Sequence, residues 1–129
     1  MNKREPLYTD LDLGLTKHPL SGDLVVVVND AAIRRCILRI IKMRRFDIPF
    51  DPSKSAFIEE FLFDPVSVAV AAALKDRLNH ALNKMEPRAE YEVTVVQRGD
   101  GLGYNVKVKY KIKATSVEGV VDLFLERVR

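Results

Sequence analysis

Two stretches in the C-terminal half of the chain alternate apolar with polar residues, and this alternation constrains the fold more than any other feature. A period of two predicts β-strands with one buried and one exposed side, over about residues 90–95 and 104–113. The glycine-bearing segment 98–103 between them is typical of a hairpin turn. One register satisfies both sides of the ribbon, with apolar partners on one side and opposite charges on the other. Its expected pairs are Gln97–Tyr104, Val93–Val108, Glu92–Lys109 and Glu90–Lys111.

Patterns upstream of this hairpin predict helices that cover a small antiparallel sheet, which is an α+β fold. A short β-branched run at 24–28 predicts a strand. It is followed by a helix over 30–45, capped by Asn29 or Asp30, with isoleucines recurring on one face. That face is expected to lie in the core.

Three further helices are expected, one of them after the hairpin. Apolar residues from position 66 onward follow helical spacing for roughly 20 residues, or about 30 Å of amphipathic helix. A shorter helix before it runs through Phe61, and a final helix packs on the sheet. The predicted helix starts are Ser53 or Ser55 for the short helix, Asp64-Pro65 for the long helix, and Thr115 or Ser116 for the final helix. The final helix would pack through Val117, Val120, Val121, Phe124, Leu125 and Val128.

Length and composition favour a single domain with one core. With 129 residues, the chain can fold without crosslinks or metal. We expect an N-terminal arm over 1–20, apolar but irregular, and a domain over 21–129. The single cysteine, Cys36, has no intramolecular partner, and the first residues show no apolar signal core, so folding in a reducing cytoplasm is expected. The formal charge of +3 is mild and does not by itself require nucleic acid.

The junction between the long helix and the hairpin carries Glu86-Pro87-Arg88. Because proline lacks an amide hydrogen and disfavours a helical residue before it, the helix should end near Met85 and leave Glu86 extended. Such a stiff tripeptide could present two opposite charges to a partner; the alternative is a helix stop with a solvated ion pair. Arg44 lies on the apolar side at the end of its helix, so its guanidinium must either reach past the helix end to solvent or find a carboxylate, for which Glu86 is a candidate.

The order of several short motifs resembles that of a known family. These motifs are Tyr8-Thr9-Asp10, Ile40-Ile41 with Arg44, Pro49-Phe50-Asp51-Pro52, Leu62-Phe63 and Glu86-Pro87-Arg88. From Tyr8 to about Lys113, the chain resembles the baseplate wedge proteins of contractile phage tails. This is the sheath-initiator family, formerly described as lysozyme-like, with relatives in type VI secretion baseplates. The Glu-Pro-Arg triplet is the most specific element. The sequence departs from the family pattern at Ser55, where members usually carry glycine.

This resemblance implies a virion structural protein, not an enzyme, that is assembled in the host cytoplasm and resides in the tail baseplate. The expected partners are a helical bundle of other wedge proteins, the tail sheath protein and the tail tube. Arms of the sheath would add strands to the sheet of this protein. The residues expected to bind partners are Glu86, Pro87, Arg88, Arg44, Pro49 and Phe50. No cofactor, metal or membrane is implied.

Other chemistries find less support in the sequence. Glycoside hydrolysis needs two carboxylates across a cleft, and neither Glu59, Glu60 nor Glu86 suggests such a pair. The two histidines and one cysteine lack zinc-ligand spacing. The alternative function is a nucleic-acid-binding module that uses the basic stripe of the 30–45 helix, although aromatic residues are not interleaved with that stripe. The stripe consists of Arg34, Arg35, Arg39, Lys42 and Arg45.

Overall fold

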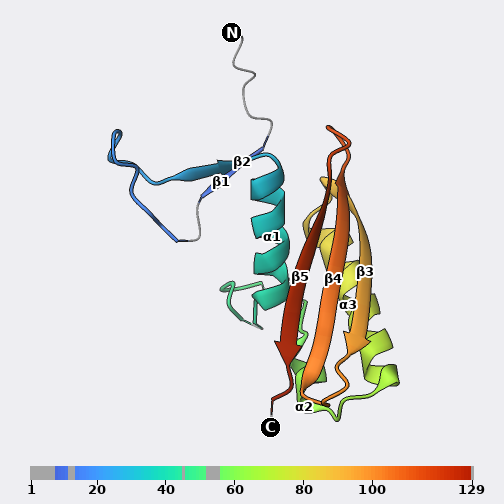
Figure 1. Cartoon of the computed structure of the whole chain (residues 1–129). Coiled ribbons are helices and arrows are strands. Elements are labelled where there is room, and N and C mark those ends of the chain that lie inside the picture. Colours follow the sequence, from blue (N-terminus) through green and yellow to red (C-terminus); the bar gives the residue numbers. More distant parts are fainter. Residues whose placement is uncertain (1–7, 12–13, 45, 52–55, 129) are drawn as a thin grey trace.

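The computed structural model describes residues 8–11, 14–44, 46–51 and 56–128. It is an α+β fold in which helices pack on one face of an antiparallel sheet, as expected (Figure 1). In order, the elements are β1 (Thr9–Leu11), β2 (Val26–Val28), α1 (Asp30–Lys42), α2 (Glu59–Phe63), α3 (Val68–Met85), β3 (Ala89–Gln97), β4 (Gly103–Ile112) and β5 (Glu118–Glu126). No helix in the described part of the chain has the length and apolar character needed to cross a bilayer.

The main sheet has the strand order β3-β4-β5, and its central hairpin has the predicted register. Gln97 pairs with Tyr104, and Val93 with Val108. The predicted charge pairs are formed as well, since Glu92 lies opposite Lys109 and Glu90 opposite Lys111. The inward residues of β4 are buried at every second position, so the alternation seen in the sequence is the alternation of core and solvent.

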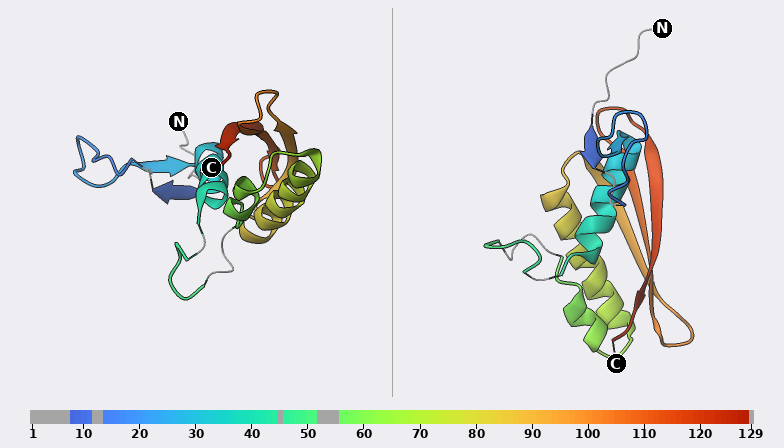
Figure 2. Two further views of the ribbon diagram at one scale, coloured as in Figure 1. Left: turned by 90° about the horizontal axis from the view of Figure 1, so that it is seen from below. Right: turned by 90° about the vertical axis from the view of Figure 1, so that its left-hand side faces the viewer.

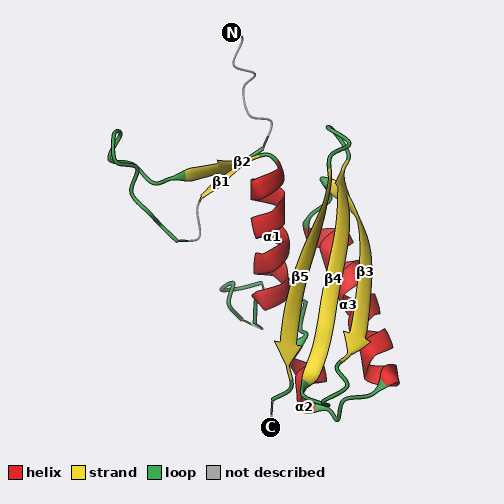
Figure 3. Cartoon of the chain, in the orientation of Figure 1, coloured by secondary structure: helices red, strands yellow, loops and turns green. Residues whose placement is uncertain are grey.

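The predicted final helix is wrong, because residues Glu118–Glu126 form β5 (Figure 3). This strand pairs antiparallel with β4 and buries Val121 and Leu125, with Leu123 partly buried between them. A helix here would form only its internal backbone hydrogen bonds and pack through one apolar face. The strand, in contrast, also pairs with the backbone groups of β4 that β3 leaves unpaired. Gly119 marks the difference, because a Cβ at this position would overlap the ring and hydroxyl of Tyr110 on the neighbouring strand.

Several helix ends also differ from the predictions. The 30–45 helix ends at Lys42, and its N-cap residue Asn29 makes no side-chain capping bond. The long helix begins at Val68 and not at Asp64-Pro65, because the Ser67 hydroxyl accepts a hydrogen bond from the Val70 amide. The short helix spans only Glu59–Phe63; its predicted start at Ser53 or Ser55 lies outside the described residues.

An N-terminal hairpin of β1 and β2 extends sideways from the start of α1 (Figures 1 and 2). β1 and β2 pair antiparallel across the predicted boundary between arm and domain, with Thr9 opposite Val28. Its loop exposes Leu15 and Leu20. The root of the hairpin is fixed by two hydrogen bonds, from the Tyr8 amide to Asn29 Oδ1 and from the Asn29 amide to the Tyr8 carbonyl.

The core lies between α1, α3 and the inner face of the main sheet. Ile33, Ile37 and Ile41 of α1 are fully buried, as are Leu74 and Leu78 of α3. The first turn of α1 is joined to the sheet by the Tyr110 hydroxyl, which donates a 2.6 Å hydrogen bond to Asp30 Oδ1. This packing fixes the end of α3, and therefore the junction that follows it, against α1.

Candidate docking site

The helix-to-hairpin junction forms a corner, here called the Glu86–Arg88 corner. α3 ends at Met85, and Glu86 leaves the helix with φ −130° and ψ 76°, outside the helical region that the following proline disfavours. Glu86 is the one buried charged residue in the described part of the chain, with 2% of its surface exposed. Its carboxylate accepts hydrogen bonds from Nε and Nη2 of Arg88, each 2.6 Å long. The carboxylate half of the ion pair is therefore buried, and the two charges are paired with each other.

Groups from three other parts of the chain contact this pair. The Tyr91 hydroxyl donates a 2.7 Å hydrogen bond to the Glu86 carbonyl. The Cys36 thiol of α1 lies close enough to the Glu86 carboxylate to lower its pKa. Tyr8, at the root of the N-terminal hairpin, places its ring 4.9 Å from the Arg88 guanidinium carbon, within the range of a cation–π contact. The corner is thus the meeting point of α1, α3, β3 and the arm.

The electrostatics of the corner keep the ion pair charged. Burial alone would raise the pKa of Glu86, but the hydrogen bonds and charge of Arg88, together with the nearby Cys36 thiol, outweigh it, so the pKa is lowered. The bond to Glu86 raises the pKa of Arg88 further above its ordinary value. Burial, with the neighbouring Glu86, raises the pKa of the Cys36 thiol to about 11, which keeps the thiol protonated and poorly nucleophilic.

Arg44 does not pair with Glu86, and this prediction is wrong. Its Nε lies 3.0 Å from Oε1 of Glu59, at the start of α2, in an exposed ion pair. Arg44 lies just past the end of α1, so its partner is set by the path of the loop that follows, which helical spacing does not reveal. The bridge joins α1 to α2 across the segment between them.

Pro49 and Phe50 lie on the loop that follows α1, and both are exposed. Phe50 is fully exposed, and Phe46 on the same loop is 68% exposed. Pro52, the end of the predicted motif, lies outside the described residues. A cavity of about 440 Å³ connects this loop to the corner region. It is lined by Cys36, Arg39, Ile40, Met43, Ile48, Asp51, Lys84 and Met85.

The two edges of the main sheet differ in their backbone bonding. At the two ends of the β3–β4 ladder, the Arg98 amide donates to the Gly103 carbonyl and the Lys113 amide donates to the Arg88 carbonyl. Together with the register, these bonds place alternate residues of β3 with their backbone groups facing away from the sheet. These outward residues are Ala89, Tyr91, Val93, Val95 and Gln97. None of their backbone groups has a hydrogen-bond partner within the part of the chain that the structure describes.

The β5 edge is tied at both ends to the rest of the domain. Arg34 of α1 donates from Nη2 to the outward Val120 carbonyl at 2.5 Å. Just beyond the strand, the Val128 amide donates to the Leu62 carbonyl of α2 at 2.9 Å. Three outward residues remain between these ties, compared with five on β3.

Several of these residues were not assigned a role from the sequence. Tyr91 could have been found, because it is the first inward position of the predicted strand and lies five residues after Glu86. Phe46 could have been noted as an aromatic residue in a charged loop. The contacts of Cys36 and Arg34 had no signal in the sequence, since they depend on how α1 packs against the sheet.

The described residues contain no cluster of three or more histidine, cysteine, aspartate or glutamate side chains that could hold a metal ion.

Comparisons with known proteins show the fold. No family model matches the chain, and no curated protein matches it in sequence. A solved structure, that of a candidate tail lysozyme from Geobacter sulfurreducens, is similar with a TM-score of 0.70 and 19% sequence identity. The match covers 81% of this chain and 98% of that one. At this identity, the comparison shows that the two chains share a fold.

Proposed function

We propose that this protein is a structural subunit of the baseplate of a contractile phage tail, in the sheath-initiator position. In this role it docks on other wedge proteins through the Glu86–Arg88 corner and templates the first ring of sheath subunits by strand addition. The observation that carries the proposal is the free backbone edge of β3. A strand edge with unpaired amide and carbonyl groups is what an extended arm of another chain needs in order to add a strand.

The corner supports the same role by its rigidity. Pro87 is exposed and Arg88 keeps 31% of its side chain accessible, while the buried Glu86 fixes the guanidinium in one position. A pre-positioned guanidinium binds with little loss of side-chain entropy. A partner would therefore contact Pro87 and the accessible part of Arg88, while Glu86 acts as a positioning residue.

The fold likeness to a candidate tail lysozyme agrees with a tail protein and raises the question of hydrolysis. Two of the carboxylates considered above for that reaction, Glu86 and Glu59, do not fit it. Glu86 is held ionised by Arg88, whereas a general acid needs a raised pKa. Glu59 is engaged by Arg44. We therefore propose a structural role, and purified protein should not clear a peptidoglycan suspension.

Two matched proline substitutions would test strand addition. Val95→Pro removes an outward amide of the β3 edge, and Asp122→Pro does the same on the β5 edge, so neither breaks a bond of the sheet. Virions assembled with V95P should have baseplates and tubes but no sheath in electron micrographs, while D122P should give sheathed tails. Sheathed tails with V95P, for a variant whose melting temperature shows that it folds, would refute strand addition at β3.

A further inference from the structure

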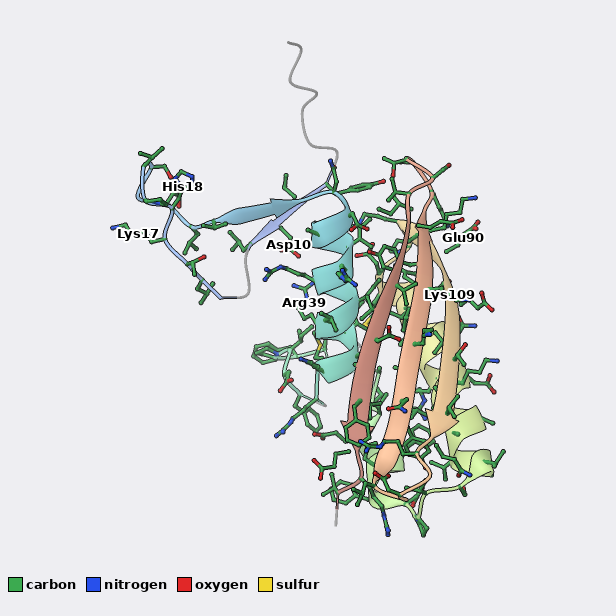
Figure 4. The ribbon with its side chains drawn as sticks, viewed as in Figure 1. Asp10, Lys17, His18, Arg39, Glu90 and Lys109 are labelled. Atoms are coloured by element: carbon green, nitrogen blue, oxygen red, sulfur yellow. The ribbon has the colours of Figure 1, made fainter. Side chains whose placement is uncertain are left out.

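A second surface lies on the outward side of α1, away from the sheet. A cavity of about 410 Å³, here called the α1 groove, runs between the C-terminal half of α1 and the loop after it. Figure 4 shows Arg39 projecting from α1 on this side, whereas Glu90 and Lys109 stand on the outer face of the sheet. The groove is lined by Leu38, Arg39, Lys42, Met43, Asp47 and Ile48.

The groove has an apolar floor between two rims of opposite charge. Leu38, Met43 and Ile48 are each partly exposed and supply the floor. The rim on the helix carries only cations, Arg39 and Lys42. The rim on the loop carries the carboxylate of Asp47, which accepts a 2.7 Å hydrogen bond from the Arg44 amide. An occupant should therefore carry acidic residues on the side that faces α1.

The spacing on α1 fits a helical occupant. Ala31, Arg35, Leu38 and Lys42 follow one another at intervals of four, three and four residues, so they form one stripe along the exposed face. A stripe of this period is what a second helix packs against. At the end of the stripe, Phe50 and Phe46 are exposed on the adjoining loop, and aromatic side chains are frequent anchors of protein interfaces.

We infer that the α1 groove binds an amphipathic α-helix of another baseplate protein, with its apolar stripe on the groove floor and its acidic flank toward Arg39 and Lys42. This inference rests on the proposed function and names the kind of partner for a surface separate from the β3 edge. It also adds Leu38 and Lys42 as partner contacts and gives the already expected contact at Phe50 a helical partner.

Nucleic acid fits this surface less well. The exposed phenylalanines would offer stacking platforms beside a basic stripe, which is a pattern of single-strand binding. Each phenylalanine, however, is followed directly by an aspartate, Asp47 after Phe46 and Asp51 after Phe50. A phosphate backbone passing from the stripe to these rings would meet both carboxylates. The apolar floor also offers nothing to a phosphate.

Site-specific photo-crosslinking in assembled virions would test the inference. A benzophenone-bearing phenylalanine is introduced in place of Leu38 or Phe50, and the same residue in place of exposed His80 on α3 serves as the control position. The expected product at Leu38 and Phe50 joins this protein to a segment of another virion protein with apolar residues at helical spacing and acidic residues on one flank. The His80 position should not give this product.

Charge reversal provides a second readout. Lys42→Glu should lower incorporation into virions about tenfold or more, because it places like charges opposite each other, while Lys75→Glu, on the exposed face of α3, should not. Crosslinks to nucleic acid, to an extended or basic segment, or none at all in virions that contain the protein would overturn the inference and leave the proposed function standing. Absence of the wild-type protein from virions would overturn both.

Discussion

The guanidinium of Arg88 forms a bidentate ion pair with the buried carboxylate of Glu86. The two residues are two positions apart in the sequence, with Pro87 between them. Because Pro87 fixes the backbone between them, little conformational entropy is lost when the pair forms. The pair is therefore an internal brace of the corner as well as part of the proposed contact surface.

Glu86→Gln removes the charge but keeps the shape of this brace. We expect a loss of about 2 kcal/mol in the free energy of unfolding, because the amide cannot accept both guanidinium bonds and leaves Arg88 incompletely paired. Urea denaturation at pH 7 measures this loss. Glu92→Gln, on the exposed side of β3, is the control and should change stability by less than about 0.5 kcal/mol. Equal effects of both variants would contradict the role of Glu86 as a brace.

The same pair predicts a pH dependence of stability. The pKa of Glu86 is lowered from its ordinary value of 4.5, so the folded protein holds the carboxylate ionised at pH values where the unfolded chain binds a proton. The stabilisation is therefore complete above the unfolded-state pKa and is lost as the pH falls through the folded-state pKa. The difference in unfolding free energy between wild type and Glu86→Gln should be constant above about pH 5.5 and shrink below pH 4.5. If the difference in unfolding free energy between wild type and Glu86→Gln stays the same down to pH 3, the ionised Glu86 carboxylate does not stabilise the folded protein.

Gly119→Ala tests the close approach of β5 to Tyr110. The added methyl group would overlap the tyrosine ring and hydroxyl, so Tyr110 would have to move and lose its bond to Asp30. A loss of about 1–3 kcal/mol is expected. Gly99→Ala is the matched control, since a Cβ there meets no atom within 4 Å. Thermal unfolding followed by circular dichroism compares the two, and an equally stable Gly119 variant would be inconsistent with the observed packing.

Arg34→Met tests the protection of the β5 edge. Methionine keeps an unbranched side chain but cannot donate to the Val120 carbonyl, which leaves this edge more open. We expect the purified variant to self-associate at lower protein concentration than wild type in sedimentation velocity experiments. Lys75→Met on α3 controls for the loss of one surface charge. If the two variants sediment alike, the hydrogen bond does not protect the edge.

Tyr8→Leu tests the attachment of the arm. A cation–π contact is worth about 0.5–1 kcal/mol at an accessible site, so its loss should speed amide exchange in β1 and β2 roughly two- to fivefold. Hydrogen exchange followed by mass spectrometry or NMR provides the measurement. Amides of β4 are an internal reference and should exchange as in the wild type. Unchanged exchange in β1 and β2 would show that Tyr8 does not fasten the arm.

The hairpin could be predicted residue by residue because two independent patterns constrained it. A shift of one residue would have exposed Val93 and buried Glu92, so one register satisfied both faces. The end of α3 was equally predictable, since Pro87 excludes a helical residue before it.

The last strand could not be separated from a helix by apolar spacing alone. Val117, Val120, Val121, Phe124, Leu125 and Val128 fit a helical stripe, whereas the alternation of Val121, Leu123 and Leu125 is typical of a strand. Gly119 and the β-branched valines around it were a usable signal against a helix. The partners of Arg44 and Cys36 were beyond the sequence, because both depend on how segments distant in sequence pack together.

The unequal edges of the main sheet have a geometric consequence. Because the β5 edge is hydrogen-bonded to α1 and α2 while the β3 edge is unpaired, a further strand can be added at the β3 edge alone. If each added chain again leaves only one edge unpaired, the assembly can grow in one direction only, starting from its first layer. The direction of assembly would then be set by the first subunit, without a further factor to determine it.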